Sequence, residues 1–307
     1  MKAVRHHTFG DASVLRYEDA DAPSPSTGEV LVRVAATSFN AIDAAIRSGY
    51  LDQVFPVRLP HVPGLDVSGT VEELGDGVSG LQVGDAVIGF LPMAGDGASA
   101  ELVLAPADVL AAAPRSISLT DAAALPTVGL SAWQALFEHA DLTSGQRILV
   151  NGAGGAVGGY AVQLAHRAGA HVIATATPRS SAAVHRQGAD EVVDRTAVSV
   201  TEAVTAPVDV VLNMAPVGDP SALLGLLKPG GVFVTTVPPA PEPPNDDLRT
   251  VALFVRSDRA QLAGLVERVD AGLLTVDVGR TLPLSDLSLV HVASDSGELR
   301  GKVVLVP

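Results

Sequence analysis

The stretch Ile148-Leu149-Val150-Asn151-Gly152-Ala153-Gly154-Gly155-Ala156-Val157-Gly158-Gly159 decides the fold of this 307-residue chain. Its first three residues have the apolar character of a buried strand, and a helical pattern follows over residues 156–168. Between them, glycine recurs at positions 152, 155 and 158. Glycine at this spacing lets the backbone turn tightly and bring the amides of a helix N-terminus close to a pyrophosphate. The stretch therefore predicts a dinucleotide-binding loop, with a purely structural tight turn as the alternative.

Strands and helices alternate around this loop. Apolar runs predict strands at 147–150, 171–176, 208–212 and 231–237. Helices are predicted between them at 156–168, 180–188 and 220–227. This alternation is typical of a parallel sheet covered by helices on both faces. A short strand at Phe254-Val255 is expected to follow the series.

The N-terminal part of the chain has a different texture. Short strand patterns at 30–34, 67–74 and 86–90 are separated by turns that contain glycine and aspartate. One short helix is predicted over 40–48, ending at Gly49. After the parallel series, a helix is expected at 258–272 and strands near 275–278 and at 302–306. The fold class is therefore α/β, with a β-rich domain and a doubly wound parallel-sheet domain.

The composition is that of a folded chain without thiol chemistry. Apolar residues make up 47% and charged residues 18%, which is enough for a sizeable core. Acidic residues outnumber basic ones by 34 to 20, and this balance argues against partners such as nucleic acids or anionic membranes. The absence of cysteine excludes disulfides, iron–sulfur clusters and every zinc site that uses thiolate. Because Met1 to His7 contain no apolar run, we expect a cytoplasmic protein.

The end of the 171–176 strand indicates which dinucleotide is preferred. An NAD site usually has Asp or Glu there, about 20 residues beyond the glycine loop, to bind the ribose hydroxyls. This chain instead has Thr175, Thr177 and Arg179. Small hydroxyls and an arginine suit a 2′-phosphate, so NADPH is the expected cofactor. The alternative is that Arg179 is an ordinary solvated arginine.

Several further segments together resemble a known family. These segments are Ser38 to Tyr50, Pro63 to Val71, Val83 to Val87, Leu227 to Gly231, and Gly301 to Leu305. In this order they resemble the zinc-independent quinone oxidoreductases of the medium-chain dehydrogenase/reductase superfamily, and the resemblance covers essentially the whole chain. Asn40 stands where the related zinc enzymes have a cysteine ligand, and Gly64-Leu65-Asp66 replaces their Gly-His-Glu element.

The resemblance implies the domain organisation. It predicts the N-terminal part of a GroES-like catalytic domain at residues 1–118 and a Rossmann NADPH-binding domain at residues 119–256. Residues 257–307 would return to the catalytic domain. The resemblance also suggests a homodimer formed through an edge strand of the Rossmann sheet, for which Gly231 to Thr236 is the candidate.

The resemblance also points to three catalytic candidates. Tyr50 is the candidate hydrogen-bond donor to the substrate oxygen, with a role as a pocket wall as the alternative. Asn40 would orient the nicotinamide ribose or the substrate, or would merely cap the helix that follows it. Asp43 would position Asn40 or Tyr50, with a structural role as the alternative. No metal site is expected.

The expected cofactor contacts combine the glycine loop, the residues after the 171–176 strand, and positions that the resemblance adds. They are Thr127, Gly152, Ala153, Gly155, Ala156, Val157, Gly158, Thr175, Thr177, Arg179, Asn213, Met214, Ala215, Val237, Phe254, Val255 and Lys302. Lys302 is expected to reach a phosphate, with a solvated lysine as the alternative.

These expectations converge on an oxidoreductase. The leading hypothesis is an NADPH-dependent enzyme that transfers hydride, without a metal, to a quinone or another α,β-unsaturated carbonyl. Its partner would be a small electrophilic acceptor. The alternatives are an enoyl reductase acting on a thioester or polyketide intermediate and a non-catalytic NADPH-binding redox sensor.

Overall fold

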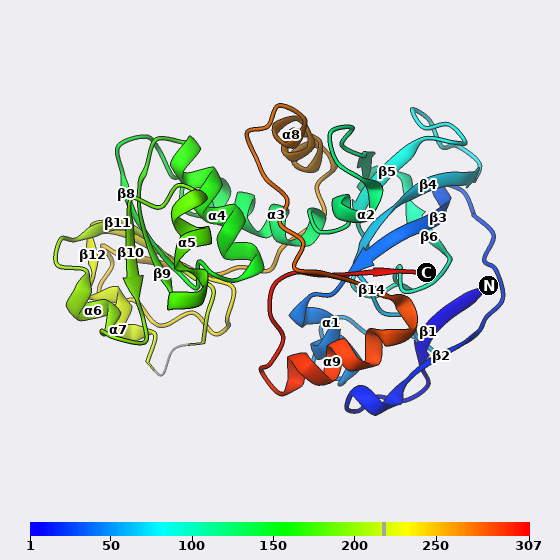
Figure 1. The fold of residues 1–307 in the computed structure, drawn as a ribbon, viewed down its shortest axis with the longest axis horizontal. Coiled ribbons are helices and arrows are strands. Elements are labelled where there is room, and N and C mark those ends of the chain that lie inside the picture. The colour runs from blue at the N-terminus through cyan, green and yellow to red at the C-terminus, as the bar shows by residue number, and fades with distance from the viewer. Residues whose placement is uncertain (217–218) are drawn as a thin grey trace. The chain divides into compact units, whose positions relative to one another are not determined.

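Two compact units make up the chain. The computed structural model describes residues 1–216 and 219–307 (Figure 1). Unit 1 contains Met1–Thr127 and Ser257–Pro307, and unit 2 contains Val128–Arg256. The first division lies within a helix, α3 (Pro126–Trp133), and not after residue 118 as the sequence suggested. The reason is that α2 (Leu119–Ala122) packs on strands of unit 1.

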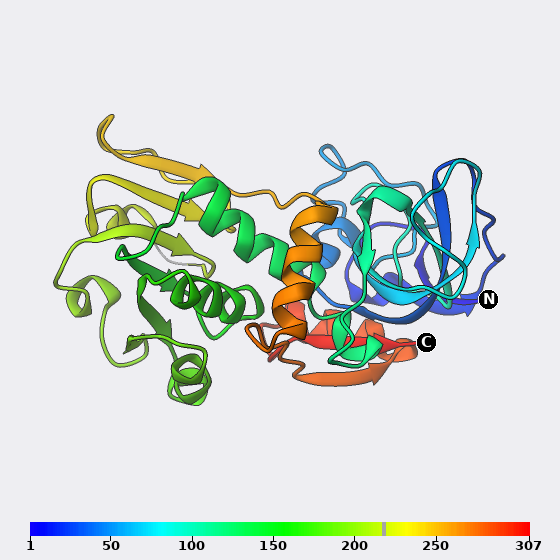
Figure 2. The same cartoon turned by 90° about the horizontal axis from the view of Figure 1, so that it is seen from above.

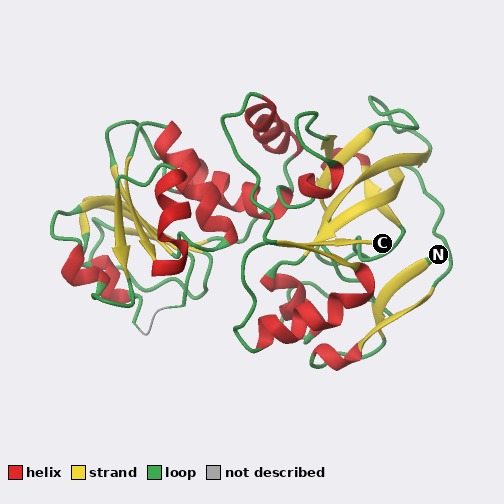
Figure 3. Ribbon diagram, in the orientation of Figure 1, coloured by secondary structure: helices red, strands yellow, loops and turns green. Residues whose placement is uncertain are grey.

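Unit 2 is built on a six-stranded parallel sheet (Figure 3). Its strands are β8 (Arg147–Asn151), β9 (His171–Ala176), β10 (Glu191–Asp194), β11 (Val208–Asn213), β12 (Leu227–Thr235) and β13 (Arg249–Ala252). Their spatial order is β10-β9-β8-β11-β12-β13, and every neighbouring pair is parallel. The order reverses between β8 and β11. In open parallel sheets, this switch point at the carboxyl ends of the strands is where ligands bind.

Helices join the parallel strands of unit 2. After α3 the chain continues as the π-helical turn η3 (Gln134–His139). The remaining helices are α4 (Ala156–Arg167), α5 (Pro178–Arg186), α6 (Val200–Ala203) and α7 (Ser221–Leu224). The strands carry apolar side chains that pack into a buried core, including Leu149, Ile173, Val211 and Phe233. The doubly wound parallel domain expected from the sequence is confirmed.

Unit 1 is mainly an antiparallel β structure. Its strands are β1 (Lys2–His6), β2 (Leu15–Asp19), β3 (Glu29–Ser38), β4 (Asp66–Leu74), β5 (Ala86–Phe90), β6 (Leu102–Pro106), β7 (Leu110–Ala112), β14 (Arg280–Pro283) and β15 (Val303–Val306). The main sheet has the order β14-β15-β3-β4-β5-β7, and β6 pairs with β3. In Figure 2 the C-terminal strand β15, in red, belongs to the same unit as the blue and cyan strands, and it pairs with β3.

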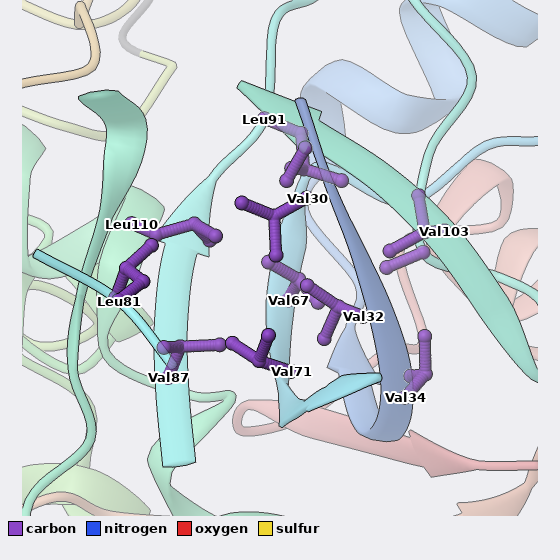
Figure 4. Close-up of a cluster of buried hydrophobic side chains, with 12 residues drawn as sticks. Val30, Val32, Val34, Val67, Val71, Leu81, Val87, Leu91, Val103 and Leu110 are labelled. Carbon is purple, nitrogen blue, oxygen red and sulfur yellow. The ribbon is translucent and has the colours of Figure 1, made fainter. Parts of the chain in front are cut away.

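Alternating valines build the core of unit 1. Val30, Val32 and Val34 of β3 belong to one buried cluster with Val67 and Val71 of β4, and Figure 4 shows Val30 and Val32 beside these two valines. The helices of this unit are α1 (Ala41–Arg47), α2, α8 (Arg259–Asp270) and α9 (Leu287–Asp295). The short turns are η1 (Ala12–Val14), η2 (Ala107–Val109) and η4 (Leu284–Asp286).

Three details of the sequence-based expectation are wrong. Phe254-Val255 is not a strand, because the last parallel strand is β13, which ends at Ala252. The strand expected near 275–278 lies later, as β14, where it pairs with β15 in parallel. Residues 231–236 cannot offer a free sheet edge, because β12 is paired on both sides and β13 occupies the edge. The dimer remains a prediction without its proposed strand.

Candidate functional site

The glycine loop joins β8 to α4 in unit 2. Gly152 adopts a φ of +92°, and the Gly155 amide donates to the Gly152 carbonyl at 3.0 Å, which closes the turn. Gly155 is the N-cap of α4, and no side chain caps this end of the helix. The Gly152 amide donates to Thr175 Oγ1 at 2.9 Å. The loop therefore presents the first-turn amides of a twelve-residue helix beside the carboxyl ends of two strands.

Two glycines of the loop are packed closely against neighbouring protein atoms. A Cβ on Gly158 would lie 2.4 Å from the Gly152 carbonyl oxygen and 2.6 Å from Ala153 Cα. A Cβ on Gly152 would lie 3.1 Å from both the Met214 carbonyl carbon and Ala215 Cβ. The helix thus packs directly on the turn, and the turn packs on the end of β11. This close approach is what a pyrophosphate cradle requires of its glycines.

A ladder of buried polar side chains crosses the carboxyl ends of four neighbouring strands. Thr175 Oγ1 donates to Asn151 Oδ1 at 2.8 Å, and Asn151 Nδ2 donates to Asn213 Oδ1 at 2.7 Å. Asn213 Nδ2 donates to Thr235 Oγ1 at 3.2 Å. Thr235 in turn exchanges hydrogen bonds with the backbone of Val237. The ladder brings together Thr175, Asn213 and Val237, which the sequence singled out, as well as Asn151 and Thr235, which it did not.

The residues after β9 form a capped helix start. Thr177 is the N-cap of α5, and its amide and hydroxyl both contact Ser180 Oγ. Arg179 is exposed in the first turn of this helix. Arg195, which the sequence analysis missed, lies beside the same strand end, because its amide donates to the Ala176 carbonyl at 3.0 Å. Its position after β10 in a parallel sheet is the signal that could have identified it.

Phe254 and Val255 belong to an extended segment of unit 2. The segment is fixed by Gln134, whose side chain donates to the Arg256 carbonyl at 2.9 Å and accepts from the Arg256 amide at 3.1 Å. Phe254 is 52% exposed. An exposed aromatic ring next to a fixed backbone is available to contact a ligand.

A second polar cluster lies in unit 1, around the buried carboxylate of Asp66. Oδ1 accepts from the amide and the hydroxyl of Thr127, each at 2.7 Å. Oδ2 accepts from Ser38 Oγ, from Asn40 Nδ2 at 2.8 Å and from Lys302 Nζ at 3.3 Å. Asp66 is fully buried, so these donors replace its hydration. They come from the end of β3, the start of α1, the start of α3 and the start of β15.

Lys302 is part of this cluster. Its ammonium also donates to Asn40 Oδ1 at 2.6 Å and to the Phe39 carbonyl at 3.1 Å. The residue is 5% exposed. With three protein acceptors around it, Lys302 is better explained as the buried counter-charge of Asp66 than as the phosphate contact or solvated lysine expected from the sequence.

Asp43 and Asn40 meet at the start of α1. Asn40 is the N-cap residue, but its side chain is directed to Asp66 and Lys302. The cap is supplied by Asp43, whose Oδ2 accepts from the Asn40 amide at 2.7 Å. Burial raises the pKa of Asp43 to about 7, an effect reduced by this hydrogen bond and strengthened by the nearby charge of Asp66.

Tyr50 is not part of either polar cluster. It follows α1 on a turn, and it is 82% exposed. Its amide donates to the Ala45 carbonyl, which places the backbone, but the ring is left in solvent. Of the three catalytic candidates, Asn40 and Asp43 are therefore adjacent and buried, whereas Tyr50 is exposed.

The described residues contain neither a cluster of metal ligands nor a helix that could span a membrane. Within residues 1–216 and 219–307, no three His, Asp or Glu side chains gather in a way that could hold a metal ion. In the same residues, no helix has the length and apolar character that crossing a membrane requires.

Comparisons with known proteins agree with this geometry. Residues 26–115 match the alcohol dehydrogenase GroES-like domain, and residues 187–305 match the zinc-binding dehydrogenase family. The chain is 31% identical to the quinone oxidoreductase of Lama guanicoe, over all of this chain and 97% of that one. It is 39% identical over 200 residues to the chloroplast envelope quinone oxidoreductase homolog of Arabidopsis thaliana. That match covers 63% of this chain and 61% of the plant protein.

Solved structures are similar over the whole chain. The quinone oxidoreductase from Coxiella burnetii has 30% sequence identity and a TM-score of 0.91, covering 100% of this chain and 99% of that one. A mycobacterial protein complexed with NADPH has 28% identity and a TM-score of 0.86, covering 100% of both chains.

The tight packing of α4 on the glycine loop predicts a large loss of stability for one substitution and a small change for the adjacent one. Gly158→Ala should lower the free energy of unfolding by about 1–3 kcal/mol, because its Cβ would meet backbone atoms that cannot move aside. Gly159→Ala is the matched control, because its Cβ would meet only the flexible end of Gln187. It should change stability by less than about 1 kcal/mol. Urea unfolding measures both, and equal losses would contradict the packing argument.

The buried Asp43 carboxyl predicts a pH dependence of stability. Its pKa is about 7 in the folded chain against an ordinary 3.8, so the folded state holds a proton that the unfolded state releases. This contribution to stability is complete below pH 3.8 and is lost as the pH rises through 7. Asp43→Asn cannot titrate, but its amide oxygen can still accept from the Asn40 amide.

The stability difference between Asp43→Asn and the wild type should therefore shift in favour of the variant as the pH rises from 4 to 8. Asp76→Asn, at an exposed turn, is the control. Unfolding at several pH values measures the effect. Curves for Asp43→Asn and the wild type that stay parallel would show that the carboxyl does not titrate in this range.

Proposed function

Because the chain belongs to the quinone oxidoreductases of the medium-chain dehydrogenase/reductase superfamily, we propose that it is an NADPH-dependent reductase. Its substrates would be quinones or other α,β-unsaturated carbonyls, reduced without a metal. The observation that carries the proposal is the glycine loop, which presents an uncapped helix N-terminus at the switch point of a parallel sheet.

The residues of unit 2 fit a dinucleotide. The amides of Ala153, Ala156 and Val157 would hold the pyrophosphate, since Gly152 and Gly158 let α4 and the turn pack closely enough to present them. Met214 and Ala215, which lie against the glycine turn, would line the ribose together with Asn213. When bound, NADPH supplies the hydride. The ladder from Thr175 to Thr235 keeps the strand ends in fixed register beneath it.

The positive charge near the end of β9 supports NADPH rather than NADH. Arg179 and Arg195 are exposed and come from the two segments that follow β9 and β10. No carboxylate occupies positions 175–180, where one would bind the ribose hydroxyls of NADH and repel a 2′-phosphate. The NADPH complex of the mycobacterial structure is a further point in favour.

The polar cluster of unit 1 supports chemistry without a metal. Asp66 already has five hydrogen-bond donors, one of them the ammonium of Lys302. A carboxylate with this donor set is a poor metal ligand, because a cation would have to displace the ammonium. Asn40, the neighbouring residue, offers a neutral amide instead of a thiolate.

Hydride transfer to a conjugated carbonyl needs less help from a Lewis acid than hydride transfer from an alcohol. As hydride adds to the conjugated carbon, negative charge develops on the carbonyl oxygen, and a fixed N–H or O–H donor stabilises it. We propose Asn40 for this role, because its amide is held by two charged neighbours. Tyr50 is proposed to give the proton that the resulting oxyanion or enolate takes up, and its exposed hydroxyl can regain a proton from water.

Turnover with a set of acceptors tests the function. We expect NADPH oxidation, followed by its absorbance, with a quinone or an alkenal, and no effect of EDTA on the rate. A saturated ketone is the control and should not be reduced. Reduction of an enoyl thioester alone would favour the enoyl reductase. Binding of NADPH without oxidation by any acceptor would favour the redox sensor and contradict the proposal.

The cofactor preference has its own test in unit 2. Arg179→Ala should weaken NADPH binding by about tenfold or more and leave NADH binding nearly unchanged, because only NADPH carries the 2′-phosphate. Arg186→Ala is the matched control, since it removes the same charge from the last turn of the same helix. Fluorescence titration of the nicotinamide measures the six affinities, those of the wild type and the two variants for each cofactor. Equal losses for both cofactors would mean that Arg179 does not contact the 2′-phosphate.

A further inference from the structure

The direction of the Asn40 side-chain amide is determined by its two charged neighbours. Lys302 has only donors, and its Nζ lies 2.6 Å from Asn40 Oδ1. Asp66 has only acceptors when ionised, and its Oδ2 lies 2.8 Å from Asn40 Nδ2. A flipped amide would place an amino group against the ammonium and an oxygen against the carboxylate. The oxygen of Asn40 must therefore face Lys302.

One proton of the Asn40 amide remains weakly engaged. Among the described residues, the other contact of Nδ2 is with the Ser38 carbonyl, at 3.5 Å, which is the outer limit of a hydrogen bond. The amide oxygen, in contrast, has a short bond to an ammonium. A charge-assisted bond at the oxygen polarises the amide and makes its N–H groups stronger donors.

We propose that Lys302 and Asp66 are positioning residues, which together set the amide of Asn40 so that it offers an N–H and not a carbonyl oxygen to the substrate. This inference rests on the proposed function, because the oxygen of a quinone or unsaturated carbonyl is the group that such a donor would serve. Lys302 is one of only three lysines in the chain, and it is the buried one.

If Lys302 had a purely structural role, it would only neutralise the charge of Asp66. Two substitutions separate this role from the proposed one, which is to orient the Asn40 amide. Lys302→Met leaves the Asp66 carboxylate without its counter-charge, so it should lower both stability and kcat/KM. Adding Asp66→Asn removes the second charge. The oxygen of the new amide would stay on the Thr127 amide, which can only donate. The amino group of the new amide at position 66 would then face Asn40. Asn40 would present its oxygen to this amino group, so its amide would be flipped relative to the wild type.

The double variant should therefore regain most of the stability that Lys302→Met loses, while its kcat/KM stays at least about tenfold below that of the wild type. NADPH affinity should change by less than about twofold, since the cofactor contacts proposed above lie in unit 2. Lys228→Met is the matched control. It removes a lysine that pairs with Asp209 in unit 2 and should leave kcat/KM unchanged. Recovery of kcat/KM together with stability in the double variant would overturn the proposal.

A second readout needs no turnover. In ¹⁵N-labelled protein, the side-chain amide signal of Asn40 is assigned by its loss in Asn40→Ala. One of its protons should resonate downfield in the wild type, because it donates to a carboxylate, and should move upfield in the double variant. If the wild type reduces no acceptor, the proposed function fails, but this shift still tests the amide direction. An Asn40 signal that is the same in both proteins would contradict the proposal.

Discussion

A carboxylate buried without solvent is the constraint on which unit 1 depends. An ionised group in such a place is stable only when its hydration is replaced by donors and its charge by a partner. Asp66 obtains both from segments far apart in the sequence: Ser38 and Asn40, Thr127, and Lys302. The strand end, two helix starts and the C-terminal strand that carry these residues must all be in place before the charge is satisfied. The same requirement fixes Asn40, the side chain proposed as the donor to the substrate.

In unit 2, neutral side chains instead of charged ones connect the ends of neighbouring strands. The ladder of Thr175, Asn151, Asn213 and Thr235 uses amides and hydroxyls, each of which both donates and accepts. Such a ladder carries no net charge, so it suits a place where an anionic pyrophosphate would bind nearby. Under the proposed function, the positive charge that an anionic cofactor requires would come from outside the ladder, from the helix N-terminus and Arg179. Under the proposed function, unit 2 would therefore bind the cofactor, and Asn40 of unit 1 would donate a hydrogen bond to the substrate.

The sequence alone predicts those elements whose formation depends on neighbouring residues in the chain. The glycine loop, β9 and β5 lie where apolar runs and turn residues predicted them, because spacing alone specifies these elements. Asn40 and Asp43 were recognised through a resemblance and are found together at a helix start. What could not be predicted depends on tertiary contacts. No local pattern shows that Lys302 is buried against Asp66, 236 positions away, or that β13 rather than β12 forms the sheet edge. Tyr50 is a candidate because it is the only tyrosine near the segment expected to form the cleft, and sequence position does not show how exposed a side chain is.

The buried ion pair of Asp66 and Lys302 is best tested by observing the lysine ammonium directly. The chain has three lysines, so a ¹H–¹⁵N spectrum of the Nζ groups is simple to assign with Lys302→Met. Exposed ammonium protons exchange quickly with water near neutral pH, whereas those of a buried group held by three acceptors are protected. We expect one protected ammonium signal at neutral pH that disappears in Lys302→Met. If Lys302 exchanged as fast as Lys2 and Lys228, the ion pair would be open to solvent, and the constraint from which the rest was derived would not exist.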